Sequence, residues 1–224
     1  AGVPVAKHGN RAVSSHCGAA DVIEALGVNL GLPPERVGAC VREVGIGFLF
    51  APMMHGAMKY AIGPRREIGI RTLFNILGPM TNPAGANVQL TGVFAPELTT
   101  VLAEVLVLLG MRRAIIVWGE GNLDEMTVTG ATHIADGHDG QVTTSIITPE
   151  EVGLKTAPFA TIRGGRTAAA AAEQVRAVLG GEPGPKLDMV LLNAGTTLMA
   201  AGLVPDIRTG IDRARETVRS GAAL

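Results

Sequence analysis

The chain has 224 residues, of which 47% are hydrophobic and 3% aromatic, and its formal net charge is −1. This length and apolar fraction suffice for a sizeable core, and the near-neutral charge provides no broad basic surface for nucleic acid. The apolar runs are far shorter than the run of about 20 residues that a membrane span needs, and no basic-then-apolar leader opens the sequence. We therefore expect a cytoplasmic protein that binds neither membranes nor nucleic acid.

The first predicted element is a buried strand in "GVPVAK". Buried parallel strands need neighbours, so we expect the sequence to begin inside a larger domain. After a polar loop, helical spacing starts at Cys17 and stops at Gly27, a candidate C-cap. A second helix is predicted in "LPPERVGACVREVG", a short buried strand in "IGFLFA", and a helix from Met53 to Ile62.

The rest of the sequence alternates strands and helices. "VQLTGVFA" and "RAIIVWG" are predicted strands on either side of an amphipathic helix over residues 98–109. Residues 125–147 predict an antiparallel hairpin around "ADGHDG", and three helices are expected to start at Thr167, Leu187 and Asp206. This order predicts an α/β fold with a mixed, largely parallel sheet flanked by helices and an antiparallel hairpin insertion, in one domain over residues 1–224.

The stretch "KHGNRAVSS" lies between the first predicted strand and the first helix, where open α/β sheets bind ligands. Lys7 offers a positive charge, Gly9 permits close approach of the backbone, and Asn10 can both donate and accept hydrogen bonds. Ser14 and Ser15 precede a helix N-terminus, whose N–H groups favour phosphate. The residues alone leave two interpretations open: an anion-binding loop, or a polar surface loop with an N-cap serine.

Two further clusters could bind ligands. Asp124 and Glu125 follow a buried strand, and Mg²⁺ binds through one or two carboxylates together with substrate phosphates. Most adjacent acidic pairs are solvated turns, and by itself this pattern favours that interpretation. His55 and Arg65, with neighbouring arginines, could orient a small carboxylate ligand, although surface arginines and a half-buried histidine explain the pattern equally well.

Two other patterns are better explained by structure than by function. Ligand-type side chains gather at His133, Asp136, His138 and Asp139, but "DGHDG" is typical of a hairpin turn. The run from Gly164 to Thr167 is similar to a phosphate loop, yet two glycines and an N-cap threonine are also ordinary before a helix.

Taken together, "KHGNRAVSS", "RREIGIRTLFNILGPMTNPA", "GEGNLDEMT" and "LLNAG" closely resemble the anthranilate phosphoribosyltransferases in wording, order and spacing. The resemblance spans nearly the whole sequence. It implies a nucleoside phosphorylase and phosphoribosyltransferase type of fold, in which a small helical domain precedes a large α/β domain and the active site lies between them. It also implies transfer of phosphoribose from phosphoribosyl pyrophosphate to the amino group of anthranilate, in tryptophan biosynthesis.

The resemblance assigns roles to individual residues. Asp124 and Glu125 match a pair that holds Mg²⁺, and Arg65, His55 and Asn10 match residues near anthranilate. No residue is expected to act as a general base, because positioning and electrostatics suffice. The loop that matches the binding site for phosphoribosyl pyrophosphate consists of Lys7, His8, Gly9, Asn10, Arg11, Ala12, Val13, Ser14 and Ser15, to which Ala19 is added in place of a family serine.

The sequence also departs from the family pattern. The family's glycine-rich "GTGGD" loop, a magnesium-binding serine and the helical domain lie upstream of the matching region, so the chain resembles a C-terminal portion. We therefore expect little turnover by the chain alone and a homodimer for the full-length parent. Two alternatives stay open: a nucleoside phosphorylase of the same fold, and a non-catalytic paralogue that binds nucleic acid.

Overall fold

The computed structural model of the chain describes residues 1–12, 17–56, 60, 63, 67, 77–78 and 80–224. They divide into two compact units, and helix α7 (Ala168–Leu179) has residues in both. The large unit comprises Ala1, Asn87–Gly164 and Val175–Leu224, and the small unit comprises Gly2–Ala86 and Gly165–Gln174.

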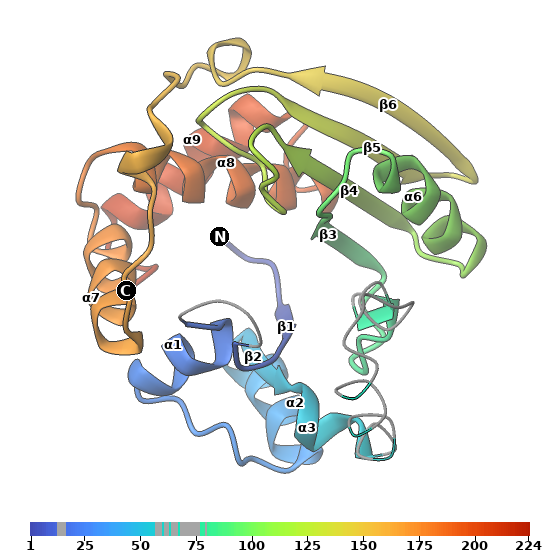
Figure 1. The fold of residues 1–224 in the computed structure, drawn as a ribbon, viewed down its shortest axis with the longest axis vertical. Helices are drawn as coiled ribbons and strands as arrows, with labels where there is room; N and C mark the ends of the chain where they lie inside the picture. Colours follow the sequence, from blue (N-terminus) through green and yellow to red (C-terminus); the bar gives the residue numbers. More distant parts are fainter. Residues whose placement is uncertain (13–16, 57–59, 61–62, 64–66, 68–76, 79) are drawn as a thin grey trace. The chain divides into compact units, whose positions relative to one another are not determined.

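The large unit is built on a four-stranded sheet (Figure 1). The first pair of strands is parallel and the other two pairs are antiparallel. Strand β4 (Arg113–Gly119) is one of the sheet's two inner strands, and its residues 114–117 are at most 1% exposed, as expected for a largely β-branched run covered on both faces. The strands, in sheet order, are β3 (Val88–Gly92), β4 (Arg113–Gly119), β5 (Thr132–His138) and β6 (Gln141–Ile147).

A two-residue turn joins β5 to β6. Asp139 and Gly140 have φ angles of 51° and 78°, the left-handed pair that the favoured hairpin turn requires. This turn confirms the hairpin that "ADGHDG" predicts. Nearby, Asp136 pairs with Arg113, with 2.6 Å between Oδ2 and Nη2, so its carboxylate has a structural partner.

Helices α6 (Leu98–Leu108) and α8 (Pro185–Ala200) cover opposite faces of this sheet. A Cβ atom at Gly137 would lie 2.7 Å from Val107 of α6, so Gly137 faces α6. The neighbouring Asp136 binds Arg113, which also donates to the carbonyl of Met199 in α8 at 3.2 Å. Because adjacent strand residues point to opposite faces, the two helices lie on opposite sides.

Helix α9 (Ile207–Arg219) packs closely on α8. Its N-cap Asp206 accepts a hydrogen bond from the Thr209 N–H at 2.8 Å. At the crossing, a Cβ on Gly195 would lie 2.6 Å from the backbone nitrogen of Ile211, and one on Gly210 would overlap the Gly195 carbonyl. Glycine at both positions therefore lets the two backbones touch. Two short 3₁₀ helices, η2 (Glu150–Val152) and η3 (Phe159–Thr161), follow β6.

In the small unit, β1 (Val5–Gly9) pairs in parallel with β2 (Ile46–Phe50). A Cβ on Gly47 would lie 2.6 Å from the Val41 side chain, so α2 (Pro34–Glu43) packs directly on β2. The described helices of this unit, besides the start of α7, are α1 (Ala19–Ala25), α2 (Pro34–Glu43) and α3 (Ala51–Met54). Gly27, at φ 97°, follows α1 as the sequence predicts.

Three predicted boundaries or environments are wrong. Strand β1 is half-exposed rather than buried, with Val5 39% exposed and β2 its single partner in the described part of the chain. Helix α3 ends at Met54, so His55, predicted within a helix from Met53 to Ile62, is its C-cap with φ −117° and ψ 68°, and the following Gly56 disfavours continuation. Residues 57–59 and 61–62 of that predicted helix lie outside the described residues. Residues 125–131, predicted as hairpin strand, form a loop before β5.

The mixed α/β class with helices flanking the sheet is confirmed. The single domain over residues 1–224 stays a prediction. Within the described residues, no helix is both long and apolar enough to cross a membrane.

Candidate functional site

The predicted anion-binding stretch begins in β1 and continues beyond it. Lys7, His8 and Gly9 are the last residues of the strand, and Lys7 and Asn10 are exposed. The Asn10 side chain accepts a hydrogen bond from the Arg11 N–H at 2.8 Å. The backbone carbonyl of Asn10 accepts one from the Ala20 N–H in α1 at 3.2 Å. The strand end is thus tied to the N-terminus of α1, where Ala19 is the first helical residue.

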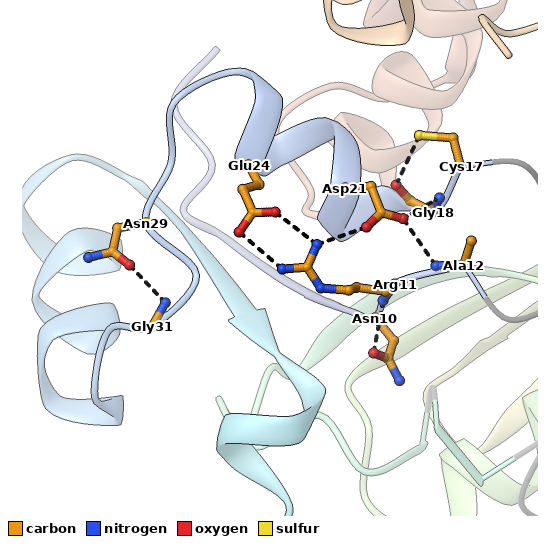
Figure 2. Close-up of polar contacts among 9 residues, drawn as sticks. All are labelled: Asn10, Arg11, Ala12, Cys17, Gly18, Asp21, Glu24, Asn29 and Gly31. Atoms are coloured by element: carbon orange, nitrogen blue, oxygen red, sulfur yellow. Dashed lines mark hydrogen bonds and ion pairs between the residues drawn. The ribbon is translucent and has the colours of Figure 1, made fainter. Parts of the chain in front are cut away.

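One carboxylate joins the two ends of this loop (Figure 2). Asp21 Oδ2 accepts hydrogen bonds from the N–H groups of Ala12 at 3.2 Å and Gly18 at 2.9 Å. Arg11 donates to Asp21 Oδ1 at 2.9 Å and to Glu24 at 2.8 Å and 3.0 Å. The Gly18 N–H, followed by Arg11, lowers the pKa of Asp21, so the carboxylate stays charged. Arg11 is therefore held against helix α1.

Gly18 is required at the base of this loop. A Cβ there would overlap the Ala12 nitrogen and lie 2.6 Å from the Arg11 carbonyl carbon. No side chain larger than hydrogen fits between the two ends of the loop. Val13, Ser14 and Ser15, and also Arg65, lie outside the described residues.

His8 and His55 meet in the small unit. Their Nε2 atoms are 3.0 Å apart and the rings are edge-on at 68°. One ring must donate and the other accept, so both cannot be protonated without losing the bond. Burial first, and the neighbouring His55 second, lower the pKa of His8. The structure therefore joins a loop residue with a residue predicted to line the anthranilate path.

The acidic pair lies in the large unit, on a loop after β4. Asp124 and Glu125 are both exposed, whereas the next three residues, Met126 to Val128, are at most 1% exposed. The two carboxylates are therefore exposed, and the segment that directly follows them is buried. The position of the pair after the carboxyl end of a strand is where α/β sheets bind ligands.

Backbone hydrogen bonds shape the start of this loop. Gly119 and Leu123 exchange two bonds, of 2.8 Å and 3.0 Å, which close a tight turn. Within it, Gly121 and Asn122 have φ angles of 88° and 63°. A Cβ at Gly92, the last residue of β3, would overlap the Asp124 carbonyl, so the end of β3 supports the acidic pair directly.

The end of the loop is anchored on α8. The Asn193 side chain accepts from the Met126 N–H at 3.1 Å and donates to the Met126 carbonyl at 2.9 Å. The fully buried Thr196 hydroxyl contacts the Met126 sulfur. Met126 is therefore held through both its backbone and its side chain.

The chemistry of the acidic pair fits a magnesium ion shared with a phosphate ligand. Two exposed, adjacent carboxylates supply hard oxygen ligands. In the described residues, no group of three or more His, Cys, Asp or Glu side chains is placed to hold a metal alone. A cation at this pair would need oxygen atoms from a substrate or water, as Mg²⁺ usually takes.

The positioning roles of two residues were not predicted from the sequence, although Asn193 lies in the motif "LLNAG". Asp21 and Asn193 contact no predicted ligand, but each fixes a loop that carries predicted site residues. One local signal exists for each: an acid in the first turn of a short helix, and an asparagine inside a 16-residue helix, where asparagine is a poor helix former. Neither signal identifies the partner.

Comparison with known proteins gives a consistent result. The sequence matches the glycosyl transferase family, a/b domain, over residues 1–224. It is 67% identical over 224 residues to the anthranilate phosphoribosyltransferase of Desulfotalea psychrophila, covering 100% of this chain and 64% of that protein. It is 56% identical to the enzyme of the same name from Trichlorobacter lovleyi, with coverage of 100% and 64%. The chain therefore spans about 64% of the length of these relatives.

Solved structures agree with the sequence comparison. The anthranilate phosphoribosyltransferase of Thermus thermophilus has a TM-score of 0.93 at 48% identity, covering 99% of this chain and 66% of that one. The Saccharomyces cerevisiae enzyme in complex with phosphoribosyl pyrophosphate and Mg has a TM-score of 0.84 at 28% identity, with coverage of 97% and 61%.

Proposed function

The chain belongs to the glycosyl transferase family, and from that membership we propose that its full-length protein transfers phosphoribose from phosphoribosyl pyrophosphate to the amine of anthranilate. The observation that carries the proposal is the 67% identity, over every residue of the chain, to an anthranilate phosphoribosyltransferase. The exposed acidic pair on a buried anchor supports it, because a phosphate-dependent transferase needs a place for a divalent cation.

The proposal assigns the substrates to the residues predicted from the sequence. Phosphoribosyl pyrophosphate is assigned to the loop from Lys7 to Ser15 together with Ala19, and Lys7 contributes an exposed positive charge. Anthranilate is assigned to Asn10, His55 and Arg65. The contact between His8 and His55 supports this grouping for the described residues, because it joins the two assigned sets.

The chemistry needs little from the protein beyond placement. The amine nitrogen bonds to C1 of the ribose as the bond between C1 and the pyrophosphate oxygen breaks, and the amine then loses a proton to water. The aromatic amine is neutral at pH 7, so no general base is assigned. Holding the amine in line with C1 and compensating the charge on pyrophosphate account for the rate.

Asp124 and Glu125 are assigned to hold Mg²⁺. When bound, this ion would neutralise charge on the pyrophosphate leaving group. The loop anchored on Met126 orients the two carboxylates for this role. The yeast relative was solved with phosphoribosyl pyrophosphate and Mg, which supports this choice of ion. A cytoplasmic location and a homodimeric full-length protein complete the proposal.

The first test removes the acidic pair. In the full-length protein, Asp124→Asn with Glu125→Gln should lower anthranilate consumption, followed by its fluorescence, on the order of 10²-fold at low Mg²⁺, because charge on the leaving group is no longer compensated. Glu97→Gln with Glu104→Gln removes the same charge from positions outside the loop and should leave activity intact.

Three results would contradict this proposal. Unchanged magnesium dependence in the Asp124 and Glu125 variant would remove the metal assignment. Phosphorolysis of nucleosides by the wild-type protein, without consumption of anthranilate, would favour the nucleoside phosphorylase alternative. A salt-dependent DNA gel shift without turnover would favour the nucleic-acid-binding one.

A further inference from the structure

We propose that Asn193 is a positioning residue that sets the orientation of Asp124 and Glu125 for a divalent cation. The inference rests on the proposed function, since it concerns the same cation. Asn193 lies in the middle of α8 and is 67 residues from Met126 in sequence. Its side-chain amide forms hydrogen bonds with backbone groups of Met126 and Met189. Asn193 therefore acts on the two carboxylates through the backbone of their loop.

The side-chain amide of Asn193 makes three hydrogen bonds. Asn193 Oδ1 accepts from the Met126 N–H at 3.1 Å, and Nδ2 donates to the carbonyls of Met126 and Met189, both at 2.9 Å. An N–H must face the amide oxygen and a carbonyl must face the amide nitrogen, so the three partners fix the orientation of the side chain. Asn193 thereby bonds both the N–H and the carbonyl of Met126, as the backbone of a neighbouring β-strand would.

Hydrogen bonds hold the peptide groups that flank the acidic pair. The Met126 N–H belongs to the peptide that joins it to Glu125, and Asn193 holds that peptide. The Leu123 carbonyl belongs to the peptide that precedes Asp124, and the Gly119 N–H holds it at 2.8 Å. The acidic pair is therefore bracketed by one fixed peptide on each side.

The backbone carbonyls of Asp124 and Glu125, which lie between these two fixed peptides, are packed against strands. The Asp124 carbonyl packs against Gly92, where no Cβ fits. A Cβ at Gly119 would lie 2.6 Å from the Glu125 carbonyl oxygen, so β4 confines that side as well. With both carbonyls packed against strands, the peptide fixed by Asn193 determines the direction in which the Glu125 side chain leaves the backbone.

Asn193 occupies a position inside α8 that helix propensity disfavours for asparagine. Asparagine is less favourable than leucine inside a helix, because its amide competes for backbone groups. Here the amide is used mainly by a loop from another element. Groups that orient metal ligands from behind typically change metal affinity about 10- to 100-fold when they are removed.

The test measures cation binding rather than turnover. The full-length protein, with phosphoribosyl pyrophosphate present, is titrated with Mn²⁺ and the free ion is followed by electron paramagnetic resonance. Asn193→Leu, which keeps the branching at Cγ and removes all three bonds, should raise the Kd for Mn²⁺ about 10-fold. Asn193→Asp, which keeps the acceptor and turns an anionic oxygen toward two carbonyls, should shift it in the same direction and serves if the leucine variant does not fold.

Two variants on the same helix serve as controls. Thr197 donates to the Asn193 carbonyl at 2.8 Å within α8, so Thr197→Val changes the helix without removing a bond to the loop. Gly195→Ala overlaps α9 and lowers stability elsewhere. Both should bind Mn²⁺ like the wild type.

The outcomes separate the two proposals. Wild-type affinity in both Asn193 variants, or equal weakening by Gly195→Ala, would overturn the positioning role and leave the proposed function standing. Failure of the wild-type protein to bind Mn²⁺ with phosphoribosyl pyrophosphate would overturn the proposed function and this inference together.

Discussion

Two polar side chains, Asp21 and Asn193, each fix a loop. Asp21 ties Ala12 to Gly18, and Asn193 ties Met126 to α8; the Asp21 carboxylate satisfies two backbone groups and the Asn193 amide satisfies three. His8 and His55 instead bond to one another through their rings. Buried polar groups that find every partner rigidify their surroundings, whereas partners left alone destabilise the fold.

The lowered pKa of His8 makes the stability of the folded protein depend on pH. Burial and His55 hold the pKa of His8 below its ordinary value of 6.5, so the folded protein favours the neutral ring. The unfolded chain then binds more protons, and the contribution of His8 to stability is complete above about pH 6.5 and is lost as the pH falls below it.

Replacing His55 should reveal this coupling. In His55→Gln, the pKa of His8 should rise and stay below 6.5, because burial, the larger cause, remains. An NMR titration of the His8 ring proton measures it. Lys7→Met should give a smaller rise, since Lys7 is the weakest cause of the shift; an unchanged pKa in His55→Gln would show that the two rings are uncoupled.

At the scale of elements, close backbone contacts organise the large unit. Helices α8 and α9 touch at Gly195 and Gly210, and β3 touches the acidic loop at Gly92. The same helix therefore carries the Asn193 contact on one side and the α9 contact on another. Packing of this density leaves little room for added atoms.

A methyl group at the helix crossing tests this contact. Gly195→Ala should destabilise the protein by about 1–3 kcal/mol, because the new Cβ meets the Ile211 backbone, which cannot move without shifting α9. Chemical denaturation measures the change. Gly164→Ala, in open space, is the matched control, and equal stability of the two variants would mean that the helices separate freely.

For the whole molecule, ligand binding should appear as added stability. The proposed substrate and cation bind the folded protein, so at a phosphoribosyl pyrophosphate concentration of about 100 Kd they should add about 2.7 kcal/mol to the free energy of unfolding.

Thermal unfolding of the full-length protein, with and without phosphoribosyl pyrophosphate and Mg²⁺, measures this change. Chelating Mg²⁺ should remove most of the shift, and Asp124→Asn with Glu125→Gln should behave as the chelated wild type. A shift that survives in that variant would place the cation elsewhere.

The sequence by itself determined the local elements and the chemical types at the site. Strand "RAIIVWG", the Asp139 and Gly140 turn, and the three C-terminal helices follow from periodicity and turn chemistry, which act over a few residues. The motifs likewise carry the family resemblance, which the comparison with known proteins supports over the whole chain.

Only the tertiary structure decided which groups hold these motifs in place. Asn193 meets Met126 across 67 residues and Gly195 meets Gly210 across a helix crossing, and no local pattern names either partner. The exposure of β1 and the end of α3 at Met54 were also decided there. The physical reason is that these features depend on how closely two separate backbones approach, and that distance is set by packing rather than by local preference.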